Sequence, residues 1–163
     1  MTVAILTISD RCSRGLAVDT SGPALADLAQ RLLSGQVVAT ACVADETDQI
    51  AAQLRTWATS TAAPNLILTT GGTGLSPRDV TPEATATVLE RRHPQLLELA
   101  RARCLATSPR AYLSRGEAGT IGRTLVVNLP GSKRGAMEFL SALADVLPHA
   151  VGILTATDSE HGA

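Results

Sequence analysis

Three continuous apolar runs constrain the fold of this chain more than any other feature. They cover Val3–Ile8, Asn65–Thr69 and Thr124–Leu129. A strand that is buried on both faces has such a sequence, because neither face meets water. Stretches with apolar residues at helical spacing separate the runs, so strands and helices alternate. We therefore predict a three-layer α/β/α domain with a mostly parallel, twisted sheet.

Helical spacing predicts most of the remaining elements. One helix is expected to be capped by Thr20 or Ser21 and to stop at Gly35, and a strand is expected over Val37–Val43. Further helical patterns cover four stretches: residues 50–58, 84–91, 94–104 and 133–147, the last one kinked or ended by Pro148. The whole chain, 1–163, is expected to be one domain with a loose tail after about residue 156.

The segment from Ala106 to Gly122 follows neither the helical nor the strand period. Irregular runs longer than about 12–15 residues in a compact domain are usually functional or disordered. We predict a functional segment, in which Tyr112 and Leu113 anchor the polar groups of Ser114 and Arg115.

A glycine-rich loop follows the run Asn65–Thr69. Gly71, Gly72 and Gly74 let backbone amides approach a ligand closely. Thr81–Pro82–Glu83 resembles a helix start, with Thr81 as the N-cap. A glycine loop that leads into a helix N-terminus favours an anion such as phosphate. A purely structural turn remains the alternative, since neither G-x-G-x-x-G nor G-x-x-x-x-G-K-[ST] occurs.

The parallel strands should bring four loops together. Right-handed crossovers place the carboxyl ends of such strands at one edge of the sheet, where ligands bind. The loops are Ser9–Ser21, Ala44–Glu46, Thr70–Asp79 and Asn128–Ser132. Carboxylates that hold Mg²⁺, next to amides that cradle phosphate oxygens, suit transfer of a phosphate-bearing group. Asp45 and Asp79 are therefore the candidate Mg²⁺ ligands.

Composition excludes several other functions. Aromatic residues make up only 2% of the chain, which argues against stacking on unpaired bases. The formal net charge of −1 gives no general attraction to nucleic acid or to an anionic membrane. No apolar run is long enough to span a membrane, and no signal peptide is expected. The three cysteines lack C-x-x-C spacing, which suits reduced thiols in a cytoplasmic protein.

With these residues identified, the chain resembles the molybdopterin-binding Mog/MoaB family, which includes the gephyrin G domain. Seven matching motifs spread over almost the whole chain: Leu6–Asp10, Asp19–Pro23, Ala44–Glu46, Thr69–Gly74, Pro77–Glu83, Leu113–Gly116 and Val127–Ser132. Departures from the family pattern are mild, such as Ala44 where a proline is common.

The resemblance implies a role in molybdenum cofactor biosynthesis. Active members use ATP and Mg²⁺ to adenylylate the terminal phosphate of molybdopterin, and release pyrophosphate. Carried over by motif, Asp45 and Asp79 are the catalytic acids. The implied substrate-binding residues share a place in the matched loops: Ser9, Asp10, Asp19, Ser21, Gly71, Gly72, Thr73, Gly74, Ser114, Asn128, Pro130, Gly131 and Ser132.

The resemblance also implies a homotrimer and contact with other molybdenum cofactor enzymes. Some family members keep the fold and lack adenylyl transfer, so a non-catalytic molybdopterin-binding or scaffolding protein is the alternative. An unrelated nucleotide-binding α/β protein is the third hypothesis.

Overall fold

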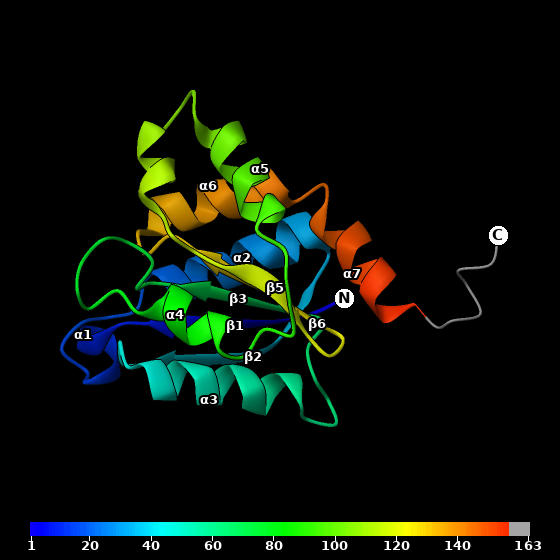
Figure 1. Ribbon diagram of the computed structural model, residues 1–163, viewed down its shortest axis with the longest axis horizontal. Coiled ribbons are helices and arrows are strands. Elements are labelled where there is room, and N and C mark those ends of the chain that lie inside the picture. The colour runs from blue at the N-terminus through cyan, green and yellow to red at the C-terminus, as the bar shows by residue number, and fades with distance from the viewer. Residues whose placement is uncertain (157–163) are drawn as a thin grey trace.

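A six-stranded sheet separates two layers of helices in the computed structural model, which describes residues 1–156 (Figure 1). The strands lie in the order β2-β1-β3-β6-β5-β4. Their bounds are β1 Thr2–Ile8, β2 Gln36–Val43, β3 Leu66–Thr70, β4 Arg91–Arg92, β5 Ala118–Ile121 and β6 Thr124–Leu129. The first four strands in this order run parallel, β5 is antiparallel to β6, and β4 is antiparallel to β5. The predicted three-layer α/β fold with a mostly parallel sheet is confirmed.

Helices cover both faces of this sheet (Figure 1). The helices are α1 Asp10–Ser13, α2 Ser21–Leu33, α3 Thr47–Ala58, α4 Thr81–Ala86, α5 Gln95–Cys104, the 3₁₀ helix η1 Pro109–Leu113, α6 Lys133–Leu143 and α7 Leu147–Thr155. Neighbouring residues of β3 point to opposite faces. Leu66 and Leu68 therefore pack with α2, α5 and α6, whereas Ile67 packs with α3 and α4.

Two predicted elements differ in the structure. The helix expected over 84–91 ends at Ala86, and Arg91–Arg92 instead form the edge strand β4. The segment expected to be irregular from Ala106 to Gly122 contains η1 and β5. Both short strands depend on pairing with their neighbours: a Cβ on Gly119 of β5 would lie 2.2 Å from the Arg91 carbonyl oxygen. Such pairing leaves no periodic signal in the sequence.

The predicted anchor in the η1 segment is also wrong. Tyr112 and Leu113 are 54% and 55% exposed, and the buried residue of η1 is Ala111. The small side chain of Ala111 is enough to fill the space between η1 and α5, because the two helices lie close together.

Helix ends differ in detail from the prediction. Thr81 is the first residue of α4 rather than its cap, and its hydroxyl donates to the Gly71 carbonyl oxygen at 2.9 Å. Neither Thr20 nor Ser21 caps α2 with its side chain, because Asp19 accepts from the first amides. That helix ends at Leu33, and Ser34 rather than the predicted Gly35 terminates it, in a left-handed conformation.

The last described residues form two helices, where one helix was predicted over 133–147. Helix α6 already ends at Leu143, and Pro148 lies in the first turn of α7, so the prediction that Pro148 kinks or ends the preceding helix is wrong. The predicted loose tail lies outside the described residues.

Within residues 1–156, no single helix has the length and apolar character of a membrane span. By these two criteria alone, α6 and α7 would qualify together, although they are bent by 65°.

Gly71 is predicted to be intolerant of a side chain. It has φ +110°, and a Cβ there would lie 2.0 Å from the Ile8 carbonyl oxygen. Gly71→Ala should therefore lower the free energy of unfolding by more than about 3 kcal/mol, from strained backbone plus overpacking. Denaturant unfolding measures this change.

Gly122→Ala is the matched control. Gly122 also has a positive φ, +54°, but no atom lies within 4 Å of its Cβ position. Only the backbone penalty of about 1–2 kcal/mol should remain. Equal losses of unfolding free energy in the two variants would contradict the role of the close approach between Gly71 and the Ile8 carbonyl.

Candidate functional site

The four loops predicted to converge do meet at the carboxyl ends of the parallel strands. Gly71, after β3, lies against the carbonyl of Ile8, the last residue of β1. The Ser9 amide donates to the Val43 carbonyl oxygen of β2 at 2.9 Å. The Thr70 hydroxyl donates to the Pro130 carbonyl oxygen at 2.8 Å, which joins β3 to the loop after β6. These contacts unite the loops at one edge of the sheet.

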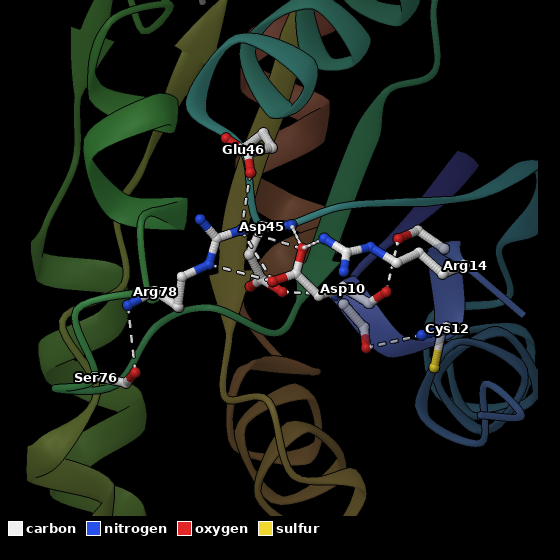
Figure 2. A network of polar contacts seen from close by, with 9 residues as sticks. Asp10, Cys12, Arg14, Asp45, Glu46, Ser76 and Arg78 are labelled. Atoms are coloured by element: carbon white, nitrogen blue, oxygen red, sulfur yellow. Dashed lines mark hydrogen bonds and ion pairs between the residues drawn. The ribbon is translucent and has the colours of Figure 1, made fainter. Parts of the chain in front are cut away.

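Asp10 and Asp45 hold the loops after β1 and β2 together (Figure 2). The Asp10 amide donates to Asp45 Oδ2 at 2.8 Å, and the Asp45 amide donates to Asp10 Oδ1 at 3.3 Å. Each residue thus orients the other's backbone and carboxylate. The reciprocal pair fixes where the Asp45 carboxylate stands.

Arg78 brings a cation to these acids from the loop after β3. Its Nη2 lies 2.9 Å from Asp10 Oδ2 and 2.9 Å from Glu46 Oε1 (Figure 2). Sequence reasoning missed Arg78, because its partners lie 68 and 32 residues away in the chain. The hint available was its place directly before Asp79.

The carboxylates of Asp45 and Asp79 both lie beside the glycine loop. A Cβ on Gly72 would lie 3.0 Å from Asp45 Oδ1, and one on Gly74 would lie 2.9 Å from Asp79 Oδ2. Asp79 Oδ2 accepts from the Ser76 amide at 2.9 Å. Among residues 1–156, Asp45 Oδ1 and Asp79 Oδ1 have no hydrogen-bond partner. Each acid therefore keeps one oxygen for a ligand.

The electrostatics distinguish Asp10 from Asp45. Partial burial acts to raise the pKa of Asp10, but hydrogen bonds from Arg78 and the Asp45 amide bring that pKa below its ordinary value. Burial raises the pKa of Asp45, and the charges of Asp10 and Asp79 raise it further. The surroundings thus disfavour the ionised form of Asp45.

Ser9, Asp19 and Ser21 serve their own loop. Ser9 Oγ accepts from the Cys12 amide at 3.2 Å, as a cap of α1. Asp19 Oδ2 accepts from the Thr7 hydroxyl at 2.6 Å, and Asp19 Oδ1 accepts from the Ser21 amide at 3.0 Å. These predicted binding residues therefore shape the loop between β1 and α2.

A hollow of about 530 Å³ adjoins the glycine loop. Six predicted site residues line it: Thr73, Gly74, Ser114, Pro130, Gly131 and Ser132. Its other lining residues include Arg110 and Leu113 of η1 and Arg134, Glu138 and Phe139 of α6. Ser132 also caps α6, since its hydroxyl accepts from the Gly135 amide at 3.1 Å.

Asn128 lies beneath the site and is not among the residues that line the hollow. It is 0% exposed, and its Nδ2 donates to the hydroxyls of Thr69 and Thr85 at 3.0 Å each. Its Oδ1 accepts from the Glu117 amide at 3.0 Å. Asn128 thus ties β6 to β3, α4 and the segment before β5.

Among the described residues there is no preformed metal cluster, and a second hollow lies away from the glycine loop. In the part of the chain that the structure describes, no three His, Cys, Asp or Glu side chains converge into a metal cluster. A larger hollow, of about 780 Å³, lies between α5 and α6 and is lined by Arg103, Lys133 and Met137 among others. It contains none of the glycine-loop residues.

Residues 4–149 match a family model described as "Probable molybdopterin binding domain". The "Molybdenum cofactor synthesis protein cinnamon" of Drosophila melanogaster is 42% identical over 154 residues, which is 94% of this chain and 26% of that protein. The chain thus spans about a quarter of that relative's length. A "Molybdopterin adenylyltransferase" of Helicobacter pylori is 37% identical over 153 residues, or 93% of this chain and 86% of that protein.

A solved structure has the same fold. It is described as the molybdopterin biosynthesis enzyme MoaB from Thermus thermophilus. It is 47% identical, covers 96% of this chain and 97% of its own, and has a TM-score of 0.89.

Asp45→Asn is predicted to stabilise the protein in the absence of cations. Because the folded pKa lies above the ordinary 3.8, ionisation of Asp45 costs folding free energy. The cost is absent below pH 3.8 and complete once the pH exceeds the raised pKa. The variant should therefore melt a few degrees above the wild type at pH 7 in EDTA, with the difference shrinking as the pH falls.

Asp48→Asn, in the first turn of α3, is the matched control. It should lower stability by about 0.3–1 kcal/mol, because an acid there complements the helix dipole. An Asp45→Asn variant that melts at or below the wild-type temperature at pH 7 would contradict the electrostatic account.

Proposed function

The chain belongs to the Mog/MoaB family of molybdopterin-binding domains, and we propose that it adenylylates molybdopterin in molybdenum cofactor biosynthesis. The H. pylori relative named for this activity supports the proposal, because the chain covers 86% of its length. The motifs shared by the family include both acids beside the glycine loop.

The proposed reaction is a displacement at phosphorus. A terminal phosphate oxygen of molybdopterin attacks the α-phosphorus of ATP and forms a new P–O bond. The bond from the α-phosphorus to the bridging oxygen breaks, and pyrophosphate leaves with its electron pair. A phosphate nucleophile is already ionised at neutral pH, so the protein needs to supply positioning and charge rather than a general base.

The observation that carries the proposal is the placement of Asp45 and Asp79 against the glycine loop. Each has an oxygen within about 3 Å of where a glycine Cβ would stand. Side chains at Gly72 and Gly74 would therefore fill the space in front of the acids. A triphosphate that lies along the loop would come within reach of both carboxylates.

The donor set fits Mg²⁺. The ion prefers few carboxylates and completes its shell with water and substrate phosphates, so two acids without a third converging ligand among the described residues suit it. The raised pKa of Asp45 indicates that its negative charge is not balanced by nearby positive groups. Asp45 and Asp79 would hold the ion, which would supply positive charge to the triphosphate when bound.

The other residues would orient the two substrates. Amides of Gly71 to Gly74 would bind phosphate oxygens. The hollow of about 530 Å³ falls in the range of about 300–1,000 Å³ that is typical of small-molecule sites, and we assign it to the pterin. The hydroxyl of Ser114 and the amides around Gly131 would then bind polar atoms of the pterin or its phosphate.

The resemblance also supports a cytoplasmic homotrimer. Sedimentation velocity at micromolar protein measures the mass, and a monomer would contradict the trimer.

Asp79→Asn is predicted to keep the fold and to slow turnover by about 100-fold or more. Asparagine can still accept from the Ser76 amide, but it lacks the charge that would hold the cation. Pyrophosphate release with molybdopterin, ATP and Mg²⁺ measures turnover, and mass spectrometry identifies the adenylylated product.

Asp48→Asn again serves as the control and should retain wild-type turnover, since Asp48 is an exposed acid of α3. No pyrophosphate from the wild type at high protein concentration, together with tight binding of molybdopterin, would favour the non-catalytic alternative. Wild-type turnover in Asp79→Asn would remove this acid from the mechanism.

A further inference from the structure

We propose that Arg115 is a positioning residue, a staple that closes the loop between Gly74 and Asp79 and so fixes the Asp79 carboxylate beside the glycine loop. The structural part of this inference stands by itself, and its effect on turnover rests on the proposed function.

Arg115 contacts the loop through its backbone and through its guanidinium group. Its amide donates to the Thr73 carbonyl oxygen at 2.8 Å. Its Nε donates to the Gly74 carbonyl oxygen at 2.7 Å, and its Nη2 donates to the Asp79 carbonyl oxygen at 2.8 Å. One side chain thus bridges the first and last residues of this loop, which Arg78 also ties to Asp10 and Glu46.

The guanidinium group also reaches the helix that follows the loop. Its Nη1 donates to Glu83 Oε1 in the first turn of α4. This hydrogen bond lowers the pKa of Glu83, so the acid remains ionised and paired at neutral pH. The loop is therefore tied at Gly74, at Asp79 and at the start of α4.

The segment that carries Arg115 is itself held in place. Arg101 Nη2 donates to the Ser114 carbonyl oxygen at 2.9 Å. A Cβ on Gly116 would lie 2.8 Å from the Asn128 carbonyl oxygen, so the backbone after Arg115 lies directly on β6. Arg115 is thus anchored to the sheet and to α5.

These anchors also fix the position of Asp79. Arg115 fixes the Asp79 backbone through its carbonyl oxygen, and the Ser76 amide fixes the Asp79 carboxylate. The contacts of Arg115 go to protein groups on three sides, and each of its three guanidinium nitrogens already donates to one of them. It acts on the reaction through Asp79.

Arginine suits this task because its planar guanidinium group spreads five donors over a fixed fork. A lysine presents three donors from a single nitrogen and cannot bridge two carbonyl groups and a carboxylate on different sides. Arg115→Lys should therefore keep the charge and lose the staple.

Amide hydrogen exchange by NMR tests the staple without turnover. The reporters are the Asp79 amide, which donates to the Ser76 carbonyl oxygen, and the Ser76 amide, which donates to Asp79 Oδ2. Their exchange should accelerate at least about tenfold in Arg115→Ala and in Arg115→Lys, with a smaller increase in Glu83→Gln. The amides of β1 and β3 should be unchanged.

Arg103→Ala is the matched control. Arg103 likewise donates to a carbonyl oxygen, that of Ala142, and to the Asp145 carboxylate, but it lies on α5 away from the glycine loop. Its loss should leave the Asp79 and Ser76 amides as in the wild type. Unchanged exchange of the Asp79 and Ser76 amides in Arg115→Ala would overturn the staple. Equal acceleration of these amides in Arg103→Ala would show a global rather than a local effect, and would overturn it too.

Turnover separates a positioning role from direct contact with ATP. If Arg115 acts through Asp79, kcat should fall by about 10- to 100-fold in Arg115→Ala with little change in KM for ATP, and Lys should not restore it. A large rise in KM for ATP with normal kcat and rescue by Lys would instead place Arg115 on the triphosphate and overturn the proposal. The exchange measurement tests the staple even if the protein proves inactive. A failure of the proposed function can therefore be distinguished from a failure of the staple.

Discussion

The close approach of Gly71 to the carbonyl of Ile8 is the constraint on which the rest of the site depends. With 2.0 Å between a notional Cβ and that oxygen, only glycine lets β3 end directly against β1. The chain then turns through a second residue with positive φ, Gly72, which faces Asp45. Thr81 reinforces the turn, because its hydroxyl donates to the Gly71 carbonyl oxygen and its amide to that of Gly72. The loops after β1, β2 and β3 can therefore meet at one point only while these positions carry no side chain.

Around this point some acids are paired with arginines, and among the described residues Asp45 is not. Arg78 pairs with both Asp10 and Glu46, and Arg115 pairs with Glu83, so these ion pairs hold the loops in place. Asp45 stands among acids in a partly buried position and has a raised pKa. Such a charge lowers the stability of the folded chain and is typical of sites arranged for a ligand. The compensated pairs build the frame, and the uncompensated acid marks where a cation would bind.

The sequence was sufficient to predict the four parallel strands of the sheet and the meeting of their loops. The buried runs ending at Ile8, Thr69 and Leu129 carry an unambiguous pattern, and parallel strands leave their loops at one edge. The pattern failed where pairing rather than burial forms the element, as in β4 and β5, and where a side chain bonds across the fold. Asn128 is buried in a network with Thr69 and Thr85, and Arg115 joins groups that lie 32–41 residues earlier in the chain. Local spacing carries no information about such partners, so both roles became visible only in three dimensions.

The most direct test of this account is a crystal structure of the protein with Mg²⁺ and a non-hydrolysable ATP analogue. The account predicts triphosphate oxygens on the amides of Gly71 to Gly74 and a cation held by the carboxylates of Asp45 and Asp79. An analogue bound in the hollow between α5 and α6, or a cation that touches neither acid, would contradict it.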